Sequence, residues 1–274
     1  MFSVVIITLK EERALPECLK SVAGNDDIVV VDSGSSDSTV AIAKAAGARV
    51  FTRAFDTFAG QRNYAQRSVE FRHPWVFHLD ADERMTEELS AECLLASARL
   101  DLDGFRVAPR MIFEGRWVPH CTDYPAYQAR FVRAPGFEFI QAGHGQREAP
   151  SMRVETLRKN YLHDISLYGV DDWLAKHRRY AQAEARKTLF ERAEHESWRD
   201  IYSSDVILRR RALKRLSFLL PFRPTLRFAY QYVLRRGFLD GPQGFHYCRL
   251  LAQYEGFIAD EIHKLKAGVS RGTQ

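Results

Sequence analysis

The sequence predicts an α/β fold, a mostly parallel sheet with helices on both faces, followed by a helical C-terminal extension. Two observations predict it. Through about the first hundred residues, apolar β-branched runs alternate with helical patterns, and the last part of the chain shows helical patterns alone. With 274 residues, 46% of them hydrophobic and 27% charged, the chain is long enough to bury a sizeable core.

The first part of the chain alternates strand with helix. Residues 2–8, FSVVIIT, form an unbroken apolar run that is typical of a strand buried on both faces. Ser36 or Asp37 is a natural N-cap for a helix over 40–46. The other expected elements are strands over 27–31, 48–51 and 75–79 and helices over 11–22, 58–69 and 86–100. In such a sheet, ligands bind beyond the carboxyl ends of the strands.

The rest of the chain changes character twice. From residue 104 to about 160, short alternating runs separated by Gly and Pro predict antiparallel strands and loops. Helical patterns then cover 171–195, 208–219, 225–236 and 245–266. The expected domains are 1–165, with halves 1–103 and 104–165, and a helical region over 166–274.

Composition and segment patterns exclude several classes of protein. The four cysteines form no CxxC pair, so we expect isolated thiols in a reducing compartment and neither a disulfide framework nor a zinc site. Met1 leads directly into a strand-like run, without a basic segment followed by an apolar one, so a signal peptide is not expected from this pattern. No apolar stretch has the length of a membrane span. A cytoplasmic location is therefore expected.

An acidic cluster follows the apolar run in WVFHLDADER. Asp80, Asp82 and Glu83 place three carboxylates within four residues. A D-x-D pair can present both carboxylates to Mg²⁺ or Mn²⁺, with waters and phosphates completing the shell. The alternative is that Asp82 and Glu83 favour the N-terminus of the following helix. Because Thr8 and Asp32 also end expected strands at the same edge, the sequence favours the metal.

Two further polar groups have both a functional and a structural interpretation. Asp32 can accept a hydrogen bond from a uracil N3–H or a ribose hydroxyl, or it can form an Asx-turn in its Ser/Gly loop. Arg62, in the patch Gln61–Arg62–Asn63, can pair with a diphosphate, or the patch can be a solvated helix face. The sequence leaves both choices open.

Four segments carry a resemblance to a known family: SVVIITLKEE, IVVVDSGSSDST, FAGQRNYA and WVFHLDADE. In this order and spacing they resemble the inverting family 2 glycosyltransferases with the GT-A (Rossmann-like) fold, closest to the bacterial lipopolysaccharide-core and exopolysaccharide enzymes. Later segments, among them FEGRWVPH, GHGQRE and RRGFLDGPQGF, are similar to that subgroup as well. The resemblance implies a metal-dependent hexosyltransferase that uses a nucleotide-sugar donor, with a uridine-linked donor expected.

The resemblance also implies roles for single residues. Thr8, Glu11 and Asp32 would bind the nucleoside, Arg62 would lie near the diphosphate, Asp80 would approach the ribose and the metal, and Asp82 would ligate the metal. The chain departs from the family at Lys10, where Asn is usual. That departure bears on the contacts to the base and leaves the class unchanged.

An inverting transfer needs a carboxylate that takes the proton of the acceptor hydroxyl. Glu148 in GHGQRE is the first candidate, since it matches the subgroup's His–Glu type of motif, and Asp123 in HCTDYP is the second. The alternative for Glu148 is a surface carboxylate paired with Arg147. His163 and His144 are further candidate metal ligands, although a lone histidine is more often a packed or hydrogen-bonded residue.

The net charge of +5 is unevenly distributed. Between residues 206 and 239 there are bases and no acid; the bases are Arg209, Arg210, Arg211, Lys214, Arg215, Arg223, Arg227, Arg235 and Arg236. With the aromatic residues among them, this run suits an anionic membrane surface, and packing against the catalytic domain is the alternative. No nucleic-acid-binding module is recognisable, so nucleic acid is not expected as a partner.

These features predict a glycosyltransferase that is peripheral on the inner face of the plasma membrane and acts on a lipid-linked or polysaccharide acceptor of the cell envelope. A sugar-1-phosphate nucleotidyltransferase is one alternative, but TLKEERALPE lacks the Gly-rich loop that such enzymes carry after the first strand. A non-catalytic nucleotide-sugar-binding scaffold is the other. The retained Asp80, Asp82 and a candidate base argue against it.

Overall fold

The computed structural model describes residues 1–142, 145–190, 202 and 222–271. The chain divides into two compact units. The first consists of Met1–Gly115 and Asp123–Leu167, and the second of Arg116–Thr122 and Tyr168–Gln274. The segment 116–122, which we expected in the first domain, therefore belongs with the second unit.

None of the helices in the described ranges is long and apolar enough to span a membrane.

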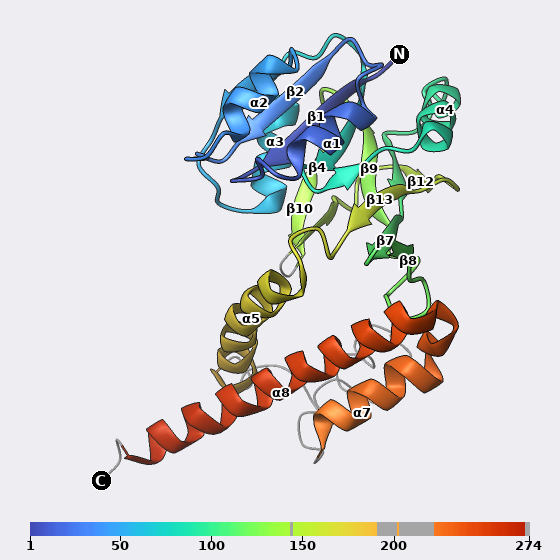
Figure 1. Cartoon of the computed structure of the whole chain (residues 1–274). Helices are drawn as coiled ribbons and strands as arrows, with labels where there is room; N and C mark the ends of the chain where they lie inside the picture. Colours follow the sequence, from blue (N-terminus) through green and yellow to red (C-terminus); the bar gives the residue numbers. More distant parts are fainter. Residues whose placement is uncertain (143–144, 191–201, 203–221, 272–274) are drawn as a thin grey trace. The chain divides into compact units, whose positions relative to one another are not determined.

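The first unit is built on a seven-stranded mixed sheet in the order β12-β6-β9-β4-β1-β2-β3 (Figure 1). Strands β1 to β4 are parallel to one another, and β9 runs antiparallel to both β4 and β6. The strands are β1 (Ser3–Thr8), β2 (Ile28–Asp32), β3 (Arg49–Thr52), β4 (Trp75–Asp80), β6 (Gly104–Val107), β9 (Gln128–Arg133) and β12 (Val154–Thr156). The predicted parallel half and antiparallel continuation are both confirmed.

Helices cover both faces of this sheet, which explains the unbroken apolar strands. The helices are α1 (Leu15–Ser21), α2 (Thr39–Ala45), α3 (Phe58–Ser68) and α4 (Glu87–Ala96). Alternate side chains of β1 face opposite layers: Val4 and Ile6 lie in the core with α1, α2 and α4, and Val5 lies in the core with α3. The N-cap position of α2 is Ser38 and not Ser36 or Asp37, but the Ser38 side chain makes no capping hydrogen bond; the Asp37 carboxylate accepts hydrogen bonds from the backbone and hydroxyl of Thr39, the first residue of the helix.

Short strands complete the first unit. β5 (Glu83–Arg84) and β13 (Tyr161–Asp164) pair antiparallel, and β13 pairs with β7 (Pro109–Phe113) in parallel. β10 (Phe139–Ala142) and β11 (Gly145–Glu148) form an antiparallel pair. The pair is tied to α3 by Asn63, whose amide exchanges two hydrogen bonds, of 2.8 and 2.9 Å, with the backbone of Phe139.

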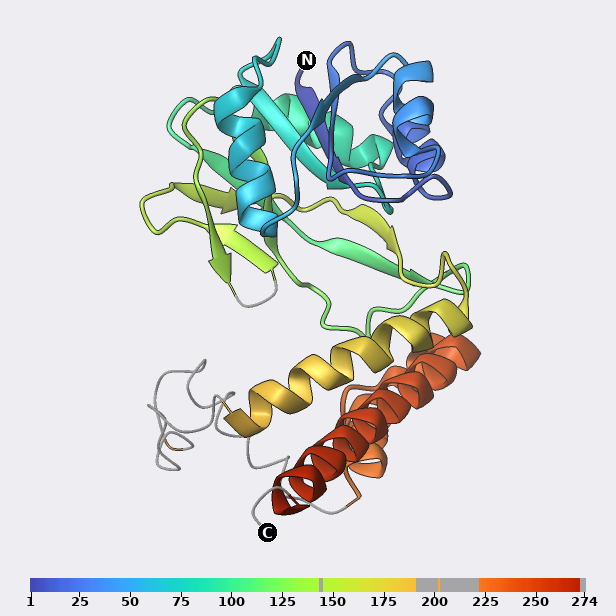
Figure 2. The ribbon, with the colours of Figure 1, turned by 90° about the vertical axis from the view of Figure 1, so that its left-hand side faces the viewer.

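The second unit is helical apart from β8 (Arg116–Trp117). Its helices are α5 (Val170–Phe190), α7 (Arg223–Ala229), the π-helix η3 (Tyr230–Leu234), the 3₁₀ helix η4 (Gly237–Asp240) and α8 (Gly241–Arg271). Figure 2 shows α5 packed beside α8, and Ala181 and Ala185 of α5 and Ile258 of α8 are buried. The helix expected over 225–236 is thus α7 continued by η3, whereas the one expected over 208–219 lies outside the described residues.

The loop 116–122 is fastened to the helices of its own unit. The buried Asp240 carboxylate accepts hydrogen bonds from the backbone amides of His120 and Cys121, at 2.9 and 2.8 Å, and it pairs with the His120 ring. Within the loop, the Cys121 thiol donates a weak hydrogen bond of 3.9 Å to the Val118 carbonyl. All four cysteines are free and buried, as expected of thiols that form no disulfide framework.

Candidate functional site

Polar residues end three neighbouring strands at one edge of the main sheet. Thr8 lies opposite Asp32 in the pairing of β1 with β2, and Ile7 lies opposite Asp80 in the pairing of β1 with β4. Because these strands are parallel, their carboxyl ends meet at the same edge. The structure therefore brings together Thr8, Asp32 and Asp80, as the sequence predicts.

Asp32 holds the loop that follows β2. Its carboxylate accepts hydrogen bonds from the backbone amides of Gly34 and Ser35, both at 2.9 Å, and from the Ser35 hydroxyl. Ser35 in turn accepts a hydrogen bond of 2.7 Å from the backbone of Lys10. The structural interpretation of Asp32 is thus present in the fold. Its role toward a nucleoside stays a prediction.

Thr8 and Glu11 lie where β1 leads into α1. Thr8 is buried, and its hydroxyl has no hydrogen-bond partner within the part of the chain that the structure describes. The backbone of Glu11 receives a hydrogen bond of 2.9 Å from Leu15 and donates one of 2.9 Å to the Thr39 hydroxyl. The loop that carries Glu11 is therefore fixed between α1 and α2.

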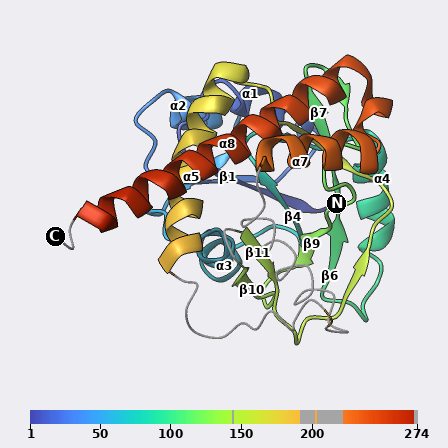
Figure 3. The same ribbon diagram turned by 90° about the horizontal axis from the view of Figure 1, so that it is seen from below.

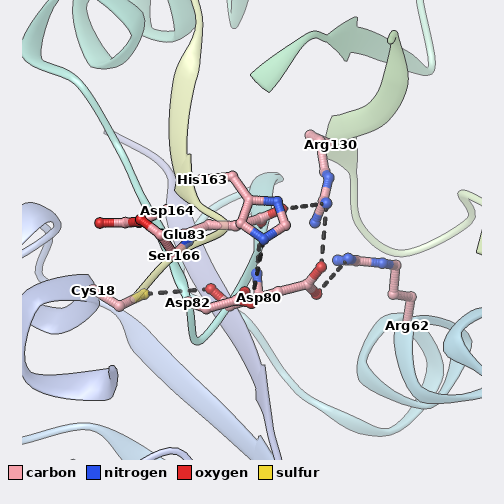
Figure 4. Close-up of polar contacts among 9 residues, drawn as sticks. All are labelled: Cys18, Arg62, Asp80, Asp82, Glu83, Arg130, His163, Asp164 and Ser166. Atoms are coloured by element: carbon pink, nitrogen blue, oxygen red, sulfur yellow. Dashed lines mark hydrogen bonds and ion pairs between the residues drawn. The ribbon is translucent and has the colours of Figure 1, made fainter. Parts of the chain in front are cut away.

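The acidic cluster is neutralised by two buried arginines (Figure 4). The Arg62 guanidinium of α3 donates to Asp80 Oδ1 at 2.7 Å, and that of Arg130 in β9 donates to Asp80 Oδ2 at 3.2 Å and to Glu83 at 2.7 Å. Glu83 also accepts a hydrogen bond of 2.9 Å from the backbone of Asp80. Two cations and two anions thus form one network, which we call the arginine–carboxylate network (Arg62, Asp80, Glu83, Arg130).

Burial and ion pairing oppose each other in this network. Burial alone would raise the pKa of Asp80, but the positive charges of Arg130 and Arg62 outweigh it and lower that pKa. For Glu83 burial dominates, and with the neighbouring Asp80 it raises the pKa despite the attraction of Arg130. Glu83 lies on β5, so the alternative that it stabilises the N-terminus of α4 is wrong.

Arg62 is 0% exposed, so the alternative of a solvated helix face is wrong for it and for the equally buried Gln61. Its Nη2 donates to Asp80, whereas Nε and Nη1 lack a hydrogen-bond partner in the described ranges. Arg62 therefore orients Asp80 in this structure. Its predicted contact with a diphosphate is a separate, untested role.

Asp82 and His163 form a second polar pair beside the network. His163 Nε2 lies 3.3 Å from Asp82 Oδ2, and each side chain is 27% exposed. The pairing of β13 with β5 places His163 opposite Glu83 and so brings it to the acidic turn. Burial would lower the pKa of His163, but the hydrogen bond and charge of Asp82 raise it to about 9.

Asp82 and His163 fit a divalent cation whose other coordination positions are filled by groups from outside the protein. Asp82 offers a carboxylate, and His163 would offer an imidazole once the cation displaces the proton that Asp82 stabilises on it; both types of donor suit Mn²⁺. Within the described residues, no group of three or more His, Cys, Asp or Glu side chains is placed to hold a metal, so the remaining donors would have to be waters or phosphates. Asp80 suits the metal less well, because arginines bind both of its oxygens. His144 lies outside the described residues.

The two candidate bases lie in different settings. Glu148, on β11, pairs with Arg106 of β6: Arg106 Nε donates to Glu148 Oε1 at 2.8 Å, and Nη2 binds the same oxygen. The alternative expectation of an arginine-paired carboxylate is thus present in the structure, but the partner is Arg106 and not Arg147, whose side chain points to the opposite face of the strand. Asp123 lies in an exposed loop of the first unit.

Two comparisons decide the family. Residues 3–138 match the model described as Glycosyl transferase family 2. LpsC of Rhizobium meliloti, a lipopolysaccharide core biosynthesis glycosyltransferase, is 39% identical over 200 residues, which are 67% of this chain and 70% of that protein. The chain belongs to glycosyltransferase family 2.

Two further similarities are weaker, one because the alignment is short and the other because the sequence identity is low. An uncharacterized glycosyltransferase of Rickettsia typhi is 37% identical over 91 residues, 33% of this chain but only 30% of that protein. A crystal structure of S. aureus TarS in complex with UDP-GlcNAc aligns with 99% of this chain and 92% of its own, at 17% identity and a TM-score of 0.46. Membership of family 2, together with the mixed sheet, confirms the predicted GT-A fold with its helical C-terminal stretch.

Arg130 is the residue of this glycosyltransferase that sequence reasoning missed. It is buried, it binds both Asp80 and Glu83, and its guanidinium lies 5.0 Å from the centre of the Tyr161 ring. A signal for it exists in the sequence. In QARFVR an arginine stands within an apolar strand run, and a charge in such a place needs a buried partner.

Proposed function

We propose that this family 2 glycosyltransferase transfers a sugar, with inversion, from a uridine diphosphate sugar to a lipid-linked or polysaccharide acceptor of the cell envelope. The observation that carries the proposal is the gathering of Thr8, Asp32, Asp80 and the Asp82–His163 pair at the carboxyl ends of parallel strands. The name of the relative LpsC supports the acceptor class, because that protein belongs to lipopolysaccharide core biosynthesis.

Asp82 and His163 are the residues that would hold a divalent cation. When bound there, the cation supplies positive charge against the diphosphate that departs from the donor. The exposed fraction of both side chains leaves room for ligands from outside the protein, which a nucleotide-sugar site requires.

Asp80 is the residue we assign to the donor ribose, with Asp32 and Glu11 toward the nucleoside. The two arginines on Asp80 hold its carboxylate in one orientation and keep it ionised, since they lower its pKa. A fixed acceptor of hydrogen bonds binds a ribose hydroxyl without the entropic cost of ordering a free side chain. The arginine–carboxylate network is therefore a preorganised support for donor binding.

Glu148 is the proposed base. The acceptor oxygen attacks the anomeric carbon from the side opposite the diphosphate, the carbon–oxygen bond to the diphosphate breaks, and the acceptor proton passes to Glu148. Arg106 binds Oε1 of Glu148, so Oε2 takes no part in that ion pair and is the oxygen to accept the proton. Asp123 is the second candidate for this role.

The experiment is a donor-turnover assay with matched variants. The purified protein is incubated with Mn²⁺, membrane lipid extract and a panel of uridine diphosphate sugars, and released uridine diphosphate is measured. We expect Glu148→Gln to lower turnover by at least about 100-fold while nucleotide binding, measured by calorimetry, is unchanged. Glu155→Gln is the control, because Glu155 also pairs with an arginine, Arg99, but at an exposed site.

Three other outcomes of this assay would each favour a different base or a different function. Normal turnover in Glu148→Gln with a loss in Asp123→Asn would move the base to Asp123. Tight binding of uridine diphosphate sugars without any turnover would favour a scaffold over an enzyme. Release of pyrophosphate from a nucleoside triphosphate and a sugar phosphate would favour a nucleotidyltransferase.

A further inference from the structure

Helix α7 and its continuation η3 expose apolar side chains to solvent. Phe222 precedes α7, and the exposed apolar residues that follow recur at helical spacing on one face: Leu226, Tyr230, Val233 and Leu234. Phe222 and Leu234 are 78% and 75% exposed. Phe238 of η4 is exposed too, and we call these six residues the outer apolar face.

The opposite side of the same helical run is polar and buried. Arg223 forms an ion pair with Glu255 of α8, and the Gln231 amide donates a hydrogen bond of 2.7 Å to the Cys121 carbonyl. Both Arg223 and Gln231 are buried. Figure 3 shows α7 beside α8. The inner side of this helical run thus carries an ion pair and an amide hydrogen bond beside the Phe228 and Tyr232 rings, while a second set of apolar side chains faces solvent.

Aromatic stacking fixes the backbone of this surface. The Phe228 and Tyr232 rings stack with centres 5.1 Å apart, and the Phe245 ring of α8 meets both edge-on at 5.6 and 5.5 Å. Phe238 joins them through Tyr232, at 6.2 Å. Because these rings anchor the helix, the exposed side chains stand on a rigid support and are not part of a frayed end.

The charged residues within the sequence of this helical run all have one sign. Between 222 and 239 the only charged residues are Arg223, Arg227, Arg235 and Arg236. The next acid, Asp240, is buried and is bound by His120 and Cys121. Arg236 is exposed, and so is Arg249, whose guanidinium lies over the Phe245 ring at 5.8 Å. The bases from Arg209 to Arg215 lie outside the described residues.

We propose that the outer apolar face binds the interfacial region of an anionic lipid bilayer. Apolar and aromatic side chains that project between cations match the acyl and headgroup layers of such a surface. A second copy of the chain is the less suitable occupant, since a two-fold interface would set arginines against arginines. This inference rests on the proposed function, because membrane binding would hold the enzyme close to the lipid-linked acceptor that we propose.

The test is flotation of the full-length protein with vesicles. We expect binding to vesicles of phosphatidylcholine with phosphatidylglycerol at low salt, weaker binding at high salt, and none to phosphatidylcholine alone. Leu234→Glu/Phe238→Glu should lower the bound fraction more than about tenfold, because two anions replace apolar contacts at the surface. The control is Leu95→Glu, since Leu95 on α4 is 79% exposed and lies in the other unit.

Three readings decide the outcome. Absence of wild-type binding at low salt overturns the proposal, and so does equal loss of binding in Leu95→Glu. Gel filtration gives the third: if the wild type dimerises and Leu234→Glu/Phe238→Glu is monomeric while vesicles bind neither, the face is a dimer interface. Turnover of a water-soluble acceptor without vesicles is measured for every variant. This separates failure of membrane docking from failure of the proposed function.

Discussion

The two units of this glycosyltransferase depart from the usual distribution of polarity in opposite directions. The first buries charges: Arg62, Arg130 and Glu83 are inaccessible beneath the ends of β1 and β4. The second exposes apolar side chains, with Phe222 and Leu234 turned to solvent while Arg223 is buried. Each arrangement is unfavourable for a protein that only needs to fold, since buried ions lose hydration and exposed apolar groups order water.

The buried charges of the first unit and the exposed apolar side chains of the second unit are compensated in different ways. In the first unit the unfavourable groups meet one another, and the arginine–carboxylate network balances its charges inside the protein. In the second unit the exposed apolar side chains have no such complement among the described residues, and the partner we propose for them is an anionic bilayer. Buried pairs should therefore matter to folding, whereas the outer apolar face should matter only to binding.

Arg130→Met tests the first half of this comparison and should have the largest effect on stability. It leaves Glu83 buried without its cation and removes one of the two arginines from Asp80. We expect the free energy of unfolding, measured by urea titration, to fall by about 3–5 kcal/mol. Arg153→Met, at the exposed pair with Asp103, should change nothing measurable.

A double variant distinguishes charge from packing in that result. Arg130→Met/Glu83→Gln should recover part of the lost stability, since the neutral amide no longer needs a counter-charge. If the double variant were as unstable as the sum of its parts, the loss would come from the space that Arg130 fills, and the network would not be an electrostatic unit.

Asp80→Asn and Asp82→Asn separate support from coordination within the acidic turn. Asp80→Asn should destabilise the fold, because it leaves Arg62 and Arg130 with less compensation. Asp82→Asn should leave stability nearly unchanged and lower Mn²⁺-dependent turnover by about 100-fold or more. Turnover after chelation, and after Mn²⁺ is returned, checks the second expectation. Unchanged Mn²⁺ dependence in Asp82→Asn would contradict the metal assignment.

The position of the polar residues at the carboxyl ends of the strands could be predicted from local sequence patterns. Val4, Ile6 and the other β-branched residues of β1 indicate a strand covered on both faces, and each predicted strand then ends on its polar residue. The convergence of Asp32 and Asp80 follows from parallel pairing alone. This part of the site is predictable because it depends on period and on sheet direction, and both are visible in a short window of sequence.

Partners that are distant in the chain could not be predicted in the same way. Arg130 reaches Asp80 only because β9 runs antiparallel beside β4, a pairing that no local pattern specifies. The same holds for Arg106 and Glu148, although the strand alternation already excludes Arg147 as the partner. For α7 the sequence shows an amphipathic helix but not which face is buried, since that depends on what α8 offers to it.

His177 offers a smaller test in the second unit. It stacks on Trp173 with ring centres 3.4 Å apart, donates from Nδ1 to the Trp173 carbonyl at 2.8 Å, and meets Tyr254 and Tyr180 edge-on. Burial, with the nearby Lys176 charge, lowers its pKa. Whereas His163 in the first unit has an acid beside it, His177 is stabilised as the neutral ring.

The pH dependence follows from that direction. The unfolded chain binds a proton at His177 at a higher pH than the folded chain does, so stability is complete above the ordinary histidine pKa of about 6.5 and falls as the pH drops below it. His177→Gln should remove this part of the pH dependence, measured as the difference in urea midpoint between variant and wild type across that range. A difference independent of pH would contradict the assignment.

The smallest expected effect is also the sharpest test of the comparison. Leu234→Ala and Leu89→Ala are the same substitution on helices of the two units, but Leu234 is 75% exposed and Leu89 is 0% exposed. Leu89→Ala should lower the free energy of unfolding by about 2–5 kcal/mol, because it leaves a cavity in the core. Leu234→Ala should change it by less than about 0.5 kcal/mol and yet weaken vesicle binding. A loss of stability at Leu234 as large as at Leu89 would show that the outer apolar face is packed within the protein in solution, and the opposition between the two units would no longer hold.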